Sequence, residues 1–275
     1  MDSSARFWRC GAMRFILACL CFFIPVASFA DDLEVDVELF LAVDVSRSMS
    51  PAELEIQRRG YAEALTSRQV LQAIESGLLG RVAITYVEWA GEYSQRVIVP
   101  WTLLQSPQEA QAIAHQITAR FDEGLRRTSI SGALIYAAGD FEGNGFSGLR
   151  RVIDISGDGP NNQGRPVERA RDAALGQGFV INGLPLMTQD ALSELWGIPD
   201  LDIYYRNCVI GGPGAFVIPV LAWDQFAAAV KRKLVLEIAG LEPRLIQAQF
   251  TPAEPYDCLI GEKMWEQNRA YFDIP

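Results

Sequence analysis

Apolar residues recur along the chain in short runs that alternate with longer segments of helical character. Branched and aromatic residues mark the predicted strands, which are 35–44, 81–90, 95–101, 151–156 and 179–187. Serine-proline starts, glycine stops and apolar residues at four-residue spacing mark the predicted helices, which are 51–76, 107–121, 130–141, 165–177, 190–196 and 223–239. Segment 204–220 contains a glycine-rich turn and is expected to supply the last strand.

This alternation predicts an α/β fold. Strands that follow helices of about 12 or more residues form a doubly wound, mostly parallel sheet with helices on both faces. The four residues 91–94 are too few for a crossover helix, so the strands on either side of them are expected to form a hairpin. The sheet should therefore have one antiparallel edge strand.

The first thirty residues have the features of an export signal. Three arginines precede the apolar run 15–26, and Ser28 and Ala30 are small residues suited to cleavage. An uncleaved anchor and a start at Met13 remain alternatives. We therefore expect a signal peptide at 1–30, a folded domain at 31–240, and a C-terminal extension at 241–275 that packs on the domain. The exported protein would be periplasmic or extracellular.

Net charge and cysteine content limit the kinds of partner and the disulfides that we expect. The chain has 24 basic and 34 acidic side chains, and removal of Asp2 and three arginines with the signal leaves 21 and 33, a net charge of −12. This charge disfavours nucleic acid or anionic lipid as a partner, and no later segment is apolar enough for a stable membrane span. Only Cys208 and Cys258 remain after the signal, and they are expected to form a disulfide that pins the extension, with two unrelated thiols as the alternative.

Oxygen-bearing side chains occur where ligands bind open parallel sheets. Asp44, Ser46 and Ser48 follow the first strand, Thr128 precedes a helix, and Asp158 follows a central strand. Two carboxylates and three hydroxyls suit a hard divalent cation, with Mg²⁺ preferred and Mn²⁺ or Ca²⁺ as alternatives. Because only two of these ligands are charged, the ion would remain able to accept a carboxylate from outside.

These five residues carry a resemblance to a known family. Asp44-x-Ser46-x-Ser48, the distant Thr128 and the strand-end Asp158-Gly159 resemble the metal-ion-dependent adhesion site (MIDAS) of von Willebrand factor A (vWA) domains. The chain is also similar to exported bacterial vWA-like proteins of unassigned function. The resemblance implies that these residues hold the metal and that an acidic residue of a protein partner completes its coordination. In some members the closing helix, here 223–239, shifts when that position is filled.

Several other residues could act near this site or elsewhere. Arg126 and Arg127 directly precede Thr128, near which family members often have glycine. These two cations could weaken metal binding or attract an anionic partner, but the favoured interpretation is that they point into solvent. Glu88 and Trp89 end a strand and could support the site or contact a partner, although a structural role is favoured. The run 231–233 (Lys-Arg-Lys) is expected to be an exposed helical face.

The favoured function is a non-catalytic, metal-dependent, adhesion-type module that binds a protein partner. One alternative is a metal-dependent phosphatase or other hydrolase on a similar sheet, but Ser46 occupies the position where that chemistry needs a second carboxylate. A serine nucleophile would need His115, which lies on a predicted surface helix. The other alternative is a vWA scaffold whose metal site is vestigial.

Overall fold

The computed structural model describes residues 32–119, 124–188, 197–240 and 256–272. In this part of the chain one sheet has five strands in the order β3-β2-β1-β4-β5. The strands are β1 (Leu33–Asp44), β2 (Val82–Trp89), β3 (Gln95–Leu104), β4 (Phe146–Gly157) and β5 (Val180–Pro185). All neighbouring pairs are parallel except β2 with β3, which is antiparallel at one edge. The predicted fold class is confirmed.

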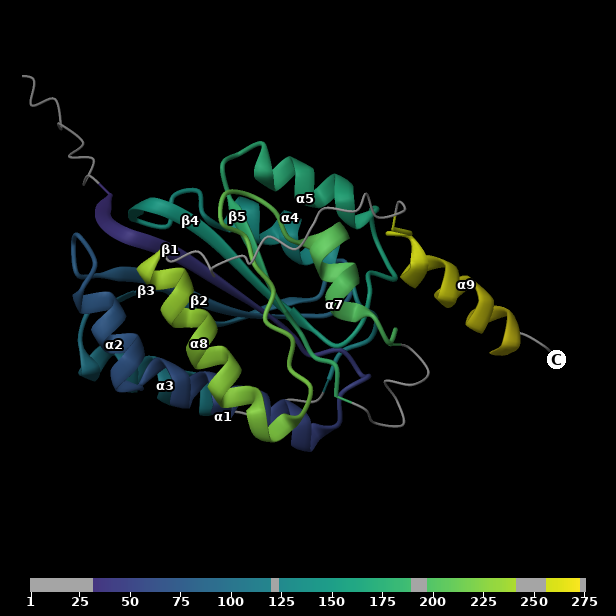
Figure 1. The fold of residues 1–275 in the computed structure, drawn as a ribbon, viewed down its shortest axis with the longest axis horizontal. Helices are drawn as coiled ribbons and strands as arrows, with labels where there is room; N and C mark the ends of the chain where they lie inside the picture. The colour runs from purple at the N-terminus through teal and green to yellow at the C-terminus, as the bar shows by residue number, and fades with distance from the viewer. Residues whose placement is uncertain (1–31, 120–123, 189–196, 241–255, 273–275) are drawn as a thin grey trace, which may run out of the picture. The chain divides into compact units, whose positions relative to one another are not determined.

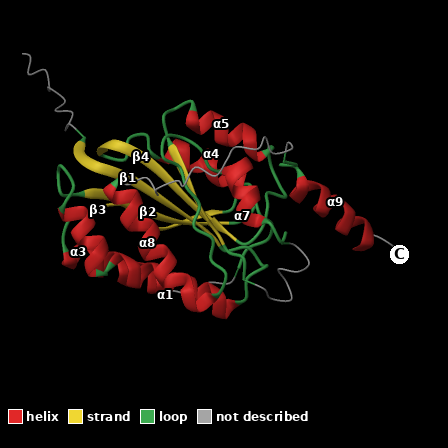
Figure 2. Cartoon of the chain, in the orientation of Figure 1, coloured by secondary structure: helices red, strands yellow, loops and turns green. Residues whose placement is uncertain are grey.

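Helices cover both faces of this sheet (Figures 1 and 2). One layer contains α1 (Pro51–Leu65), α2 (Arg68–Glu75), α3 (Pro107–Thr118) and α8 (Phe226–Ala239). The other contains α4 (Ile130–Asp140), α5 (Val167–Leu175), α7 (Leu201–Tyr204) and the π-helical turn η1 (Tyr205–Val209). A 3-10 turn, η2 (Trp223–Gln225), precedes α8, and α9 (Ile260–Phe272) is the last described helix. None of the helices described is long and apolar enough to span a bilayer.

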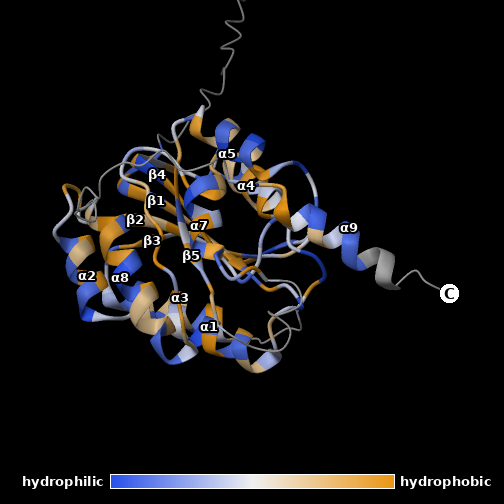
Figure 3. Ribbon diagram, turned by 45° about the vertical axis from the view of Figure 1, so that its right-hand side comes forward, coloured by the Kyte–Doolittle hydropathy of each residue, from blue (hydrophilic) through white to orange (hydrophobic). Residues whose placement is uncertain are grey.

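The central strand β1 separates two apolar cores. Leu39 and Leu41 pack with the layer that contains α1 and α8, whereas Phe40 and Ala42 pack with the layer that contains α4 and α5. Successive side chains of a strand point to opposite faces, so a strand covered on both sides is apolar throughout. Figure 3 accordingly shows hydrophobic strands beneath helices of mixed character. This burial carries Asp44, the last residue of β1, into the interior.

Two predicted elements have different limits in the structure. The predicted helix 51–76 is two helices, because Thr66 ends α1 and the hydroxyl of Ser67 accepts the Val70 amide at the start of α2. Strand β4 starts at Phe146, five residues before the start of the predicted strand 151–156. There the amide of Gly148 donates to Glu38 at 2.6 Å, so a side chain of β1 stabilises the extension of the strand.

The expected last strand within 204–220 is wrong. Its beginning is helical, in α7 and η1, and residues 211–220 make only isolated bridges to β5 and the residue after it. Pro213 and Pro219 lack the amide hydrogen that a strand ladder requires. The helix expected at 190–196 lies outside the described residues. Helix α9 was not predicted within the extension 241–275.

The basic run 231–233 is not entirely exposed, which corrects the sequence-based expectation. Arg232 is exposed, but Lys233 is fully buried in the face of α8 that packs on the sheet. Its Nζ lies 2.5 Å from Asp154 Oδ1 of β4 and 2.6 Å from Glu237 Oε1, one helical turn later. Asn182 Nδ2 donates to the same Glu237 oxygen at 2.9 Å. An ionic cluster therefore joins α8 to the centre of the sheet.

The buried cluster predicts a pH-dependent stability. Burial, followed by the charge of Asp154 and opposed by Lys233, raises the pKa of Glu237 to about 7. An unfolded glutamate ionises near pH ~4.3, so above that pH the unfolded chain releases a proton that folded Glu237 retains. The free energy of unfolding should therefore fall as pH rises toward 7 and then level off, with a loss on the order of 3 kcal/mol from this group.

Glu237→Gln should remove that part of the pH dependence. The glutamine oxygen still accepts from Lys233 and Asn182 but has no proton to lose. Urea unfolding of the wild type and the variant at pH 5 and pH 8 measures the effect. Relative to the wild type, the free energy of unfolding of the variant should rise by about 2–3 kcal/mol from pH 5 to pH 8. Two parallel profiles would show that Glu237 does not titrate in this range.

Candidate metal centre

The loop that follows β1 is fixed by backbone hydrogen bonds on both sides. The amide of Val45 donates to the carbonyl of Trp89 at 2.9 Å, and the amide of Leu125 donates to the carbonyl of Val45 at 2.8 Å. Gln57 of α1 donates to the carbonyl of Asp44 at 2.8 Å. The chain from Asp44 to Ser48 is therefore held between β2, α1 and the segment before α4.

Three of the predicted ligands meet through their side chains. The hydroxyls of Ser46 and Ser48 lie 2.9 Å apart, and Ser48 donates to Asp158 Oδ1 at 2.8 Å. Ser46 lies 3.5 Å from the same carboxylate oxygen. Asp158 comes directly after β4, the strand beside β1, so the parallel pairing brings it to the Ser46-Ser48 loop. Alternate side chains of that loop thus point to one carboxylate.

Asp44 lies beneath this cluster and is completely buried. Its Oδ1 accepts the amide of Ser46 at 2.7 Å. Burial and, next, the negative charge of Asp158 raise the pKa of the Asp44 carboxyl well above its usual range, against the hydrogen bonds from Ser46. Its second oxygen, Oδ2, is buried without a hydrogen-bond partner. A divalent cation would supply that missing interaction and offset the repulsion between the two acids.

Thr128 is held by its backbone to the loop that follows Asp158. Its amide donates to Asn162 Oδ1 at 3.0 Å, and its carbonyl accepts the Asn162 amide at 2.8 Å. Asn162 lies in the loop that follows Asp158, so these two bonds join the backbone of Thr128 to that loop. The side chains of Ser46, Ser48 and Asp158 are thus in direct contact. Asp44 is connected to them by its hydrogen bond to the Ser46 amide, and Thr128 only through the loop that follows Asp158.

The donor set fits a hard cation. All five side chains offer oxygen, of which two groups are carboxylates, as Mg²⁺, Mn²⁺ and Ca²⁺ favour. Across the described ranges there is no group of three or more His, Cys, Asp or Glu side chains that could bind a metal. The candidate centre therefore depends on hydroxyls for more than half of its protein ligands.

Sequence reasoning missed Tyr205. A methyl group on Gly157 would lie 2.9 Å from both Asp44 Oδ2 and the Tyr205 hydroxyl, so glycine leaves room for the two groups. The hydroxyl is buried without a hydrogen-bond partner, and burial followed by the charge of Asp44 raises its pKa. Tyr205 belongs to the segment that was expected to contain a strand, and no local motif in the sequence marks it.

The four neighbouring residues considered from the sequence divide into two groups. Glu88 and Trp89 are buried, and Glu88 pairs with Arg58 and Arg96, so these two residues support β2 and have no surface to offer a partner. Arg126 is exposed at the surface. Arg127 does not point freely into solvent: it has a φ of 76° and lies 3.3 Å over the ring of Trp265 in α9.

A cavity of about 890 Å³ with a lining of mixed polarity adjoins the site. Asp158 lies at its wall, and the apolar side chains in its lining include Leu186, Met187, Ile198, Leu221 and Trp223. Leu221 is 61% exposed. The Trp223 indole donates to Glu53 at 2.8 Å and thereby joins η2, which directly precedes α8, to the first turn of α1. The candidate centre is thus bordered by surface that a partner can reach.

Comparison with protein-family models and solved structures gives the wider context. A model described as "Protein of unknown function (DUF1194)" matches residues 34–242. No curated protein sequence matches this chain. Among solved structures, proximal thread matrix protein 1 from the mussel byssus has a TM-score of 0.55 and 15% identity, over 76% of this chain and 49% of its own. A second structure of that protein, at a TM-score of 0.52 and 14% identity over the same shares, is described as having a zinc-occupied MIDAS motif.

Two bacterial structures have the same fold. The pilus adhesin SpaC from Lactobacillus rhamnosus GG has a TM-score of 0.55 and 14% identity, over 76% of this chain and 31% of its own. A von Willebrand factor type A protein from Catenulispora acidiphila has a TM-score of 0.52 and 15% identity, over 76% and 43%. This chain spans less than half the length of each of these proteins. The likeness confirms the predicted vWA-like fold.

Proposed function

We infer that this chain, which belongs to the DUF1194 family of proteins of unknown function, binds a divalent cation and through it an acidic residue of a protein partner. The proposed ligands are Asp44, Ser46, Ser48, Thr128 and Asp158. The observation that carries this inference is the buried, unpaired Oδ2 of Asp44 beneath the hydroxyl–carboxylate cluster of Ser46, Ser48 and Asp158. A cation there satisfies an oxygen that is otherwise costly to bury.

The chemistry of the ligands supports a binding role for the ion. Two carboxylates balance the charge of a dication, and neutral hydroxyls leave it able to attract another anion. Mg²⁺ is the preferred ion because every donor is oxygen. The fold is shared with a mussel protein described with a zinc-occupied MIDAS motif and with a pilus adhesin, which adds to the case for a metal-dependent protein contact.

A non-catalytic role agrees with the same residues. Ser46, at the position where an aspartate-based hydrolase needs a second acid, is engaged with Ser48 and Asp158. His115, the only histidine, is on the exposed side of α3, whose buried residues face the core. We therefore propose that the exported protein, periplasmic or extracellular, acts by binding and has neither a nucleic acid partner nor a stable membrane span.

Asp44→Asn tests the cation site. The asparagine oxygen can still accept the Ser46 amide, but the negative charge is lost. Calorimetric titration with MgCl₂ and MnCl₂ should give binding to the wild type and none to the variant. In EDTA the variant should be at least as stable as the wild type, because it no longer buries a charge beside Asp158. Saturating metal should stabilise only the wild type, by about 2.7 kcal/mol at 100 times Kd.

The matched control is Asp172→Asn, which removes an exposed aspartate of α5 and should bind metal like the wild type. Equal metal binding by Asp44→Asn would rule out the proposed ligand set. A wild type that binds neither ion would favour the vestigial scaffold. A partner recovered from envelope extract supports adhesion only if EDTA and Asp44→Asn both release it while Asp172→Asn retains it.

A further inference from the structure

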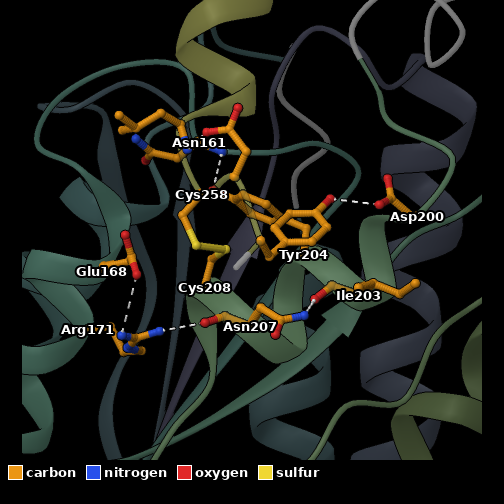
Figure 4. Close-up of a disulfide and its surroundings, with 12 residues drawn as sticks. Asn161, Glu168, Arg171, Asp200, Ile203, Tyr204, Asn207, Cys208 and Cys258 are labelled. Atoms are coloured by element: carbon orange, nitrogen blue, oxygen red, sulfur yellow. Dashed lines mark hydrogen bonds and ion pairs between the residues drawn. A yellow bond between two sulfur atoms is a disulfide. The ribbon is translucent and has the colours of Figure 1, made fainter. Parts of the chain in front are cut away.

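Helix α9 is tied to the domain by a disulfide. Cys258, two residues before the helix, is bonded to Cys208 of η1, which is fully buried (Figure 4). Tyr256, on the same side of the bond, packs against the ring of Tyr204 at a centroid distance of 6.1 Å and donates to Asp200 at 2.8 Å. The start of α9 is therefore fixed in place beside η1.

The first turns of α9 contact the two loops of the candidate metal centre. Glu262 Oε1 accepts a hydrogen bond from Asn161 Nδ2 at 2.7 Å. A side chain at Gly261 would collide with the carbonyl of Asn161, so only glycine allows this close approach. Trp265, one turn further on, lies against Arg127 at 3.3 Å. Asn161 is three residues from Asp158, and Arg127 directly precedes Thr128.

Asn161 is the junction of these contacts. It is fully buried, its amide donates to the Tyr204 hydroxyl at 3.1 Å, and its Oδ1 accepts the amide of Ser131 in α4 at 3.0 Å. The next residue, Asn162, holds the backbone of Thr128. One short loop thus connects Asp158, Thr128, α4 and α9. The disulfide holds the start of α9 against the domain and so maintains the contact of α9 with this loop.

We propose that α9 is a positioning element of the metal centre and that the site keeps its affinity only while the Cys208–Cys258 bond is intact. This proposal rests on the cation-binding function proposed above. Outer groups that orient metal ligands commonly change affinity by about 10- to 100-fold when they are removed. Here Glu262 and Trp265 are the outer groups, and the disulfide keeps them at the loops.

Reduction provides the direct test. A dithiol such as dithiothreitol supplies two electrons and two protons, the sulfur–sulfur bond breaks to give two thiols, and the dithiol becomes a cyclic disulfide. We expect the Kd for Mn²⁺ of the full chain, measured by calorimetry, to rise by about 10-fold or more on reduction. Cys258→Ser should bind Mn²⁺ as weakly as the reduced wild type. Circular dichroism checks that both remain folded.

Glu262 variants test the positioning role with the disulfide intact. Glu262→Ala removes the acceptor for Asn161 and should weaken Mn²⁺ binding, whereas Glu262→Gln keeps an acceptor oxygen and should restore it. Lys263→Ala is the control, because Lys263 is on the exposed side of the same helix and pairs with Asp257. A role limited to stability would change the melting temperature and leave the Kd of folded Glu262→Ala unchanged.

Hydrogen exchange in EDTA tests the proposal without metal. The amides of Thr128, Ser131 and Asn161 should exchange faster in the reduced protein and in Glu262→Ala, while the amides at the centre of β1 remain protected. If the oxidised protein binds no ion, the proposed function fails and these amides still test the contact. The positioning proposal is overturned if the amides and the Kd of Glu262→Ala and of the reduced protein match the oxidised wild type.

Discussion

Lys233→Met should lower the free energy of unfolding by about 3–5 kcal/mol at pH 8, because it leaves two buried carboxylates without their cation. Lys233 Nζ contacts Asp154 at 2.5 Å and Glu237 at 2.6 Å, and all three side chains are almost completely inaccessible. Methionine has a similar length, so the loss reflects charge more than volume. Urea or thermal unfolding at pH 8 gives the difference from the wild type.

Arg232→Met is the matched control. Arg232 is the exposed neighbour of Lys233 in α8, and its replacement should change stability by no more than about 0.5 kcal/mol. Replacing the acids as well, by Asp154→Asn and Glu237→Gln, should recover much of the stability that Lys233→Met loses, because no charge then remains buried. If Lys233→Met and Arg232→Met have the same free energy of unfolding, the buried ionic cluster makes no net contribution to stability.

The location of Lys233 shows the limit of reading charge patterns from a sequence. Three successive cations on a helix look like a solvated face, yet Lys233 has the helical position of Phe226, Val230 and Glu237, which are all buried. Helical periodicity could have placed Lys233 on the inner face. The need for a partner could then have directed attention to Asp154, an acid in an otherwise apolar strand.

The fold could be predicted because its signals are local. Strand β1 is apolar on both faces, and the serine caps of α1 and α3 stand in the sequence as capping motifs. The failed strand in 204–220 is a failure of the same kind of reasoning: branched residues indicate a strand, but prolines and glycines leave the segment with isolated bridges only. Tertiary contact with β5, which composition does not record, decides its conformation.

The candidate metal ligands could be predicted from the sequence, but the residues that surround and orient them could not. Asp44, Ser46, Ser48 and Asp158 meet as the strand order implies. Their surroundings depend on contacts distant in sequence. Tyr205 lies beside Asp44, and Trp265 of α9 packs on Arg127. No sequence motif indicates either contact. A prediction of metal ligands from spacing therefore omits the groups that orient them.

Glu88→Gln should also lower the free energy of unfolding, by about 3 kcal/mol, because Glu88 holds a buried arginine in the core. Glu88 Oε1 accepts from Arg58 Nε at 2.5 Å, and Oε2 lies 2.6 Å from Arg96. Glu88 is fully buried, as is nearly all of the Arg58 side chain, whereas the Arg96 side chain is 31% exposed. The glutamine oxygen retains a hydrogen bond but not the counter-charge for two guanidinium groups.

The neighbouring residue of α1 supplies the comparison. Arg59 pairs with Glu55 at 2.5 Å, but these side chains are 64% and 43% exposed. Water screens such a pair, so Glu55→Gln should change stability by about 0.5 kcal/mol or less. If Glu88→Gln and Glu55→Gln lower the free energy of unfolding equally, burial does not strengthen the ion pairs of Glu88. A larger loss in Glu88→Gln assigns this acid to the support of β2, whose last carbonyl holds the loop between Asp44 and Ser48.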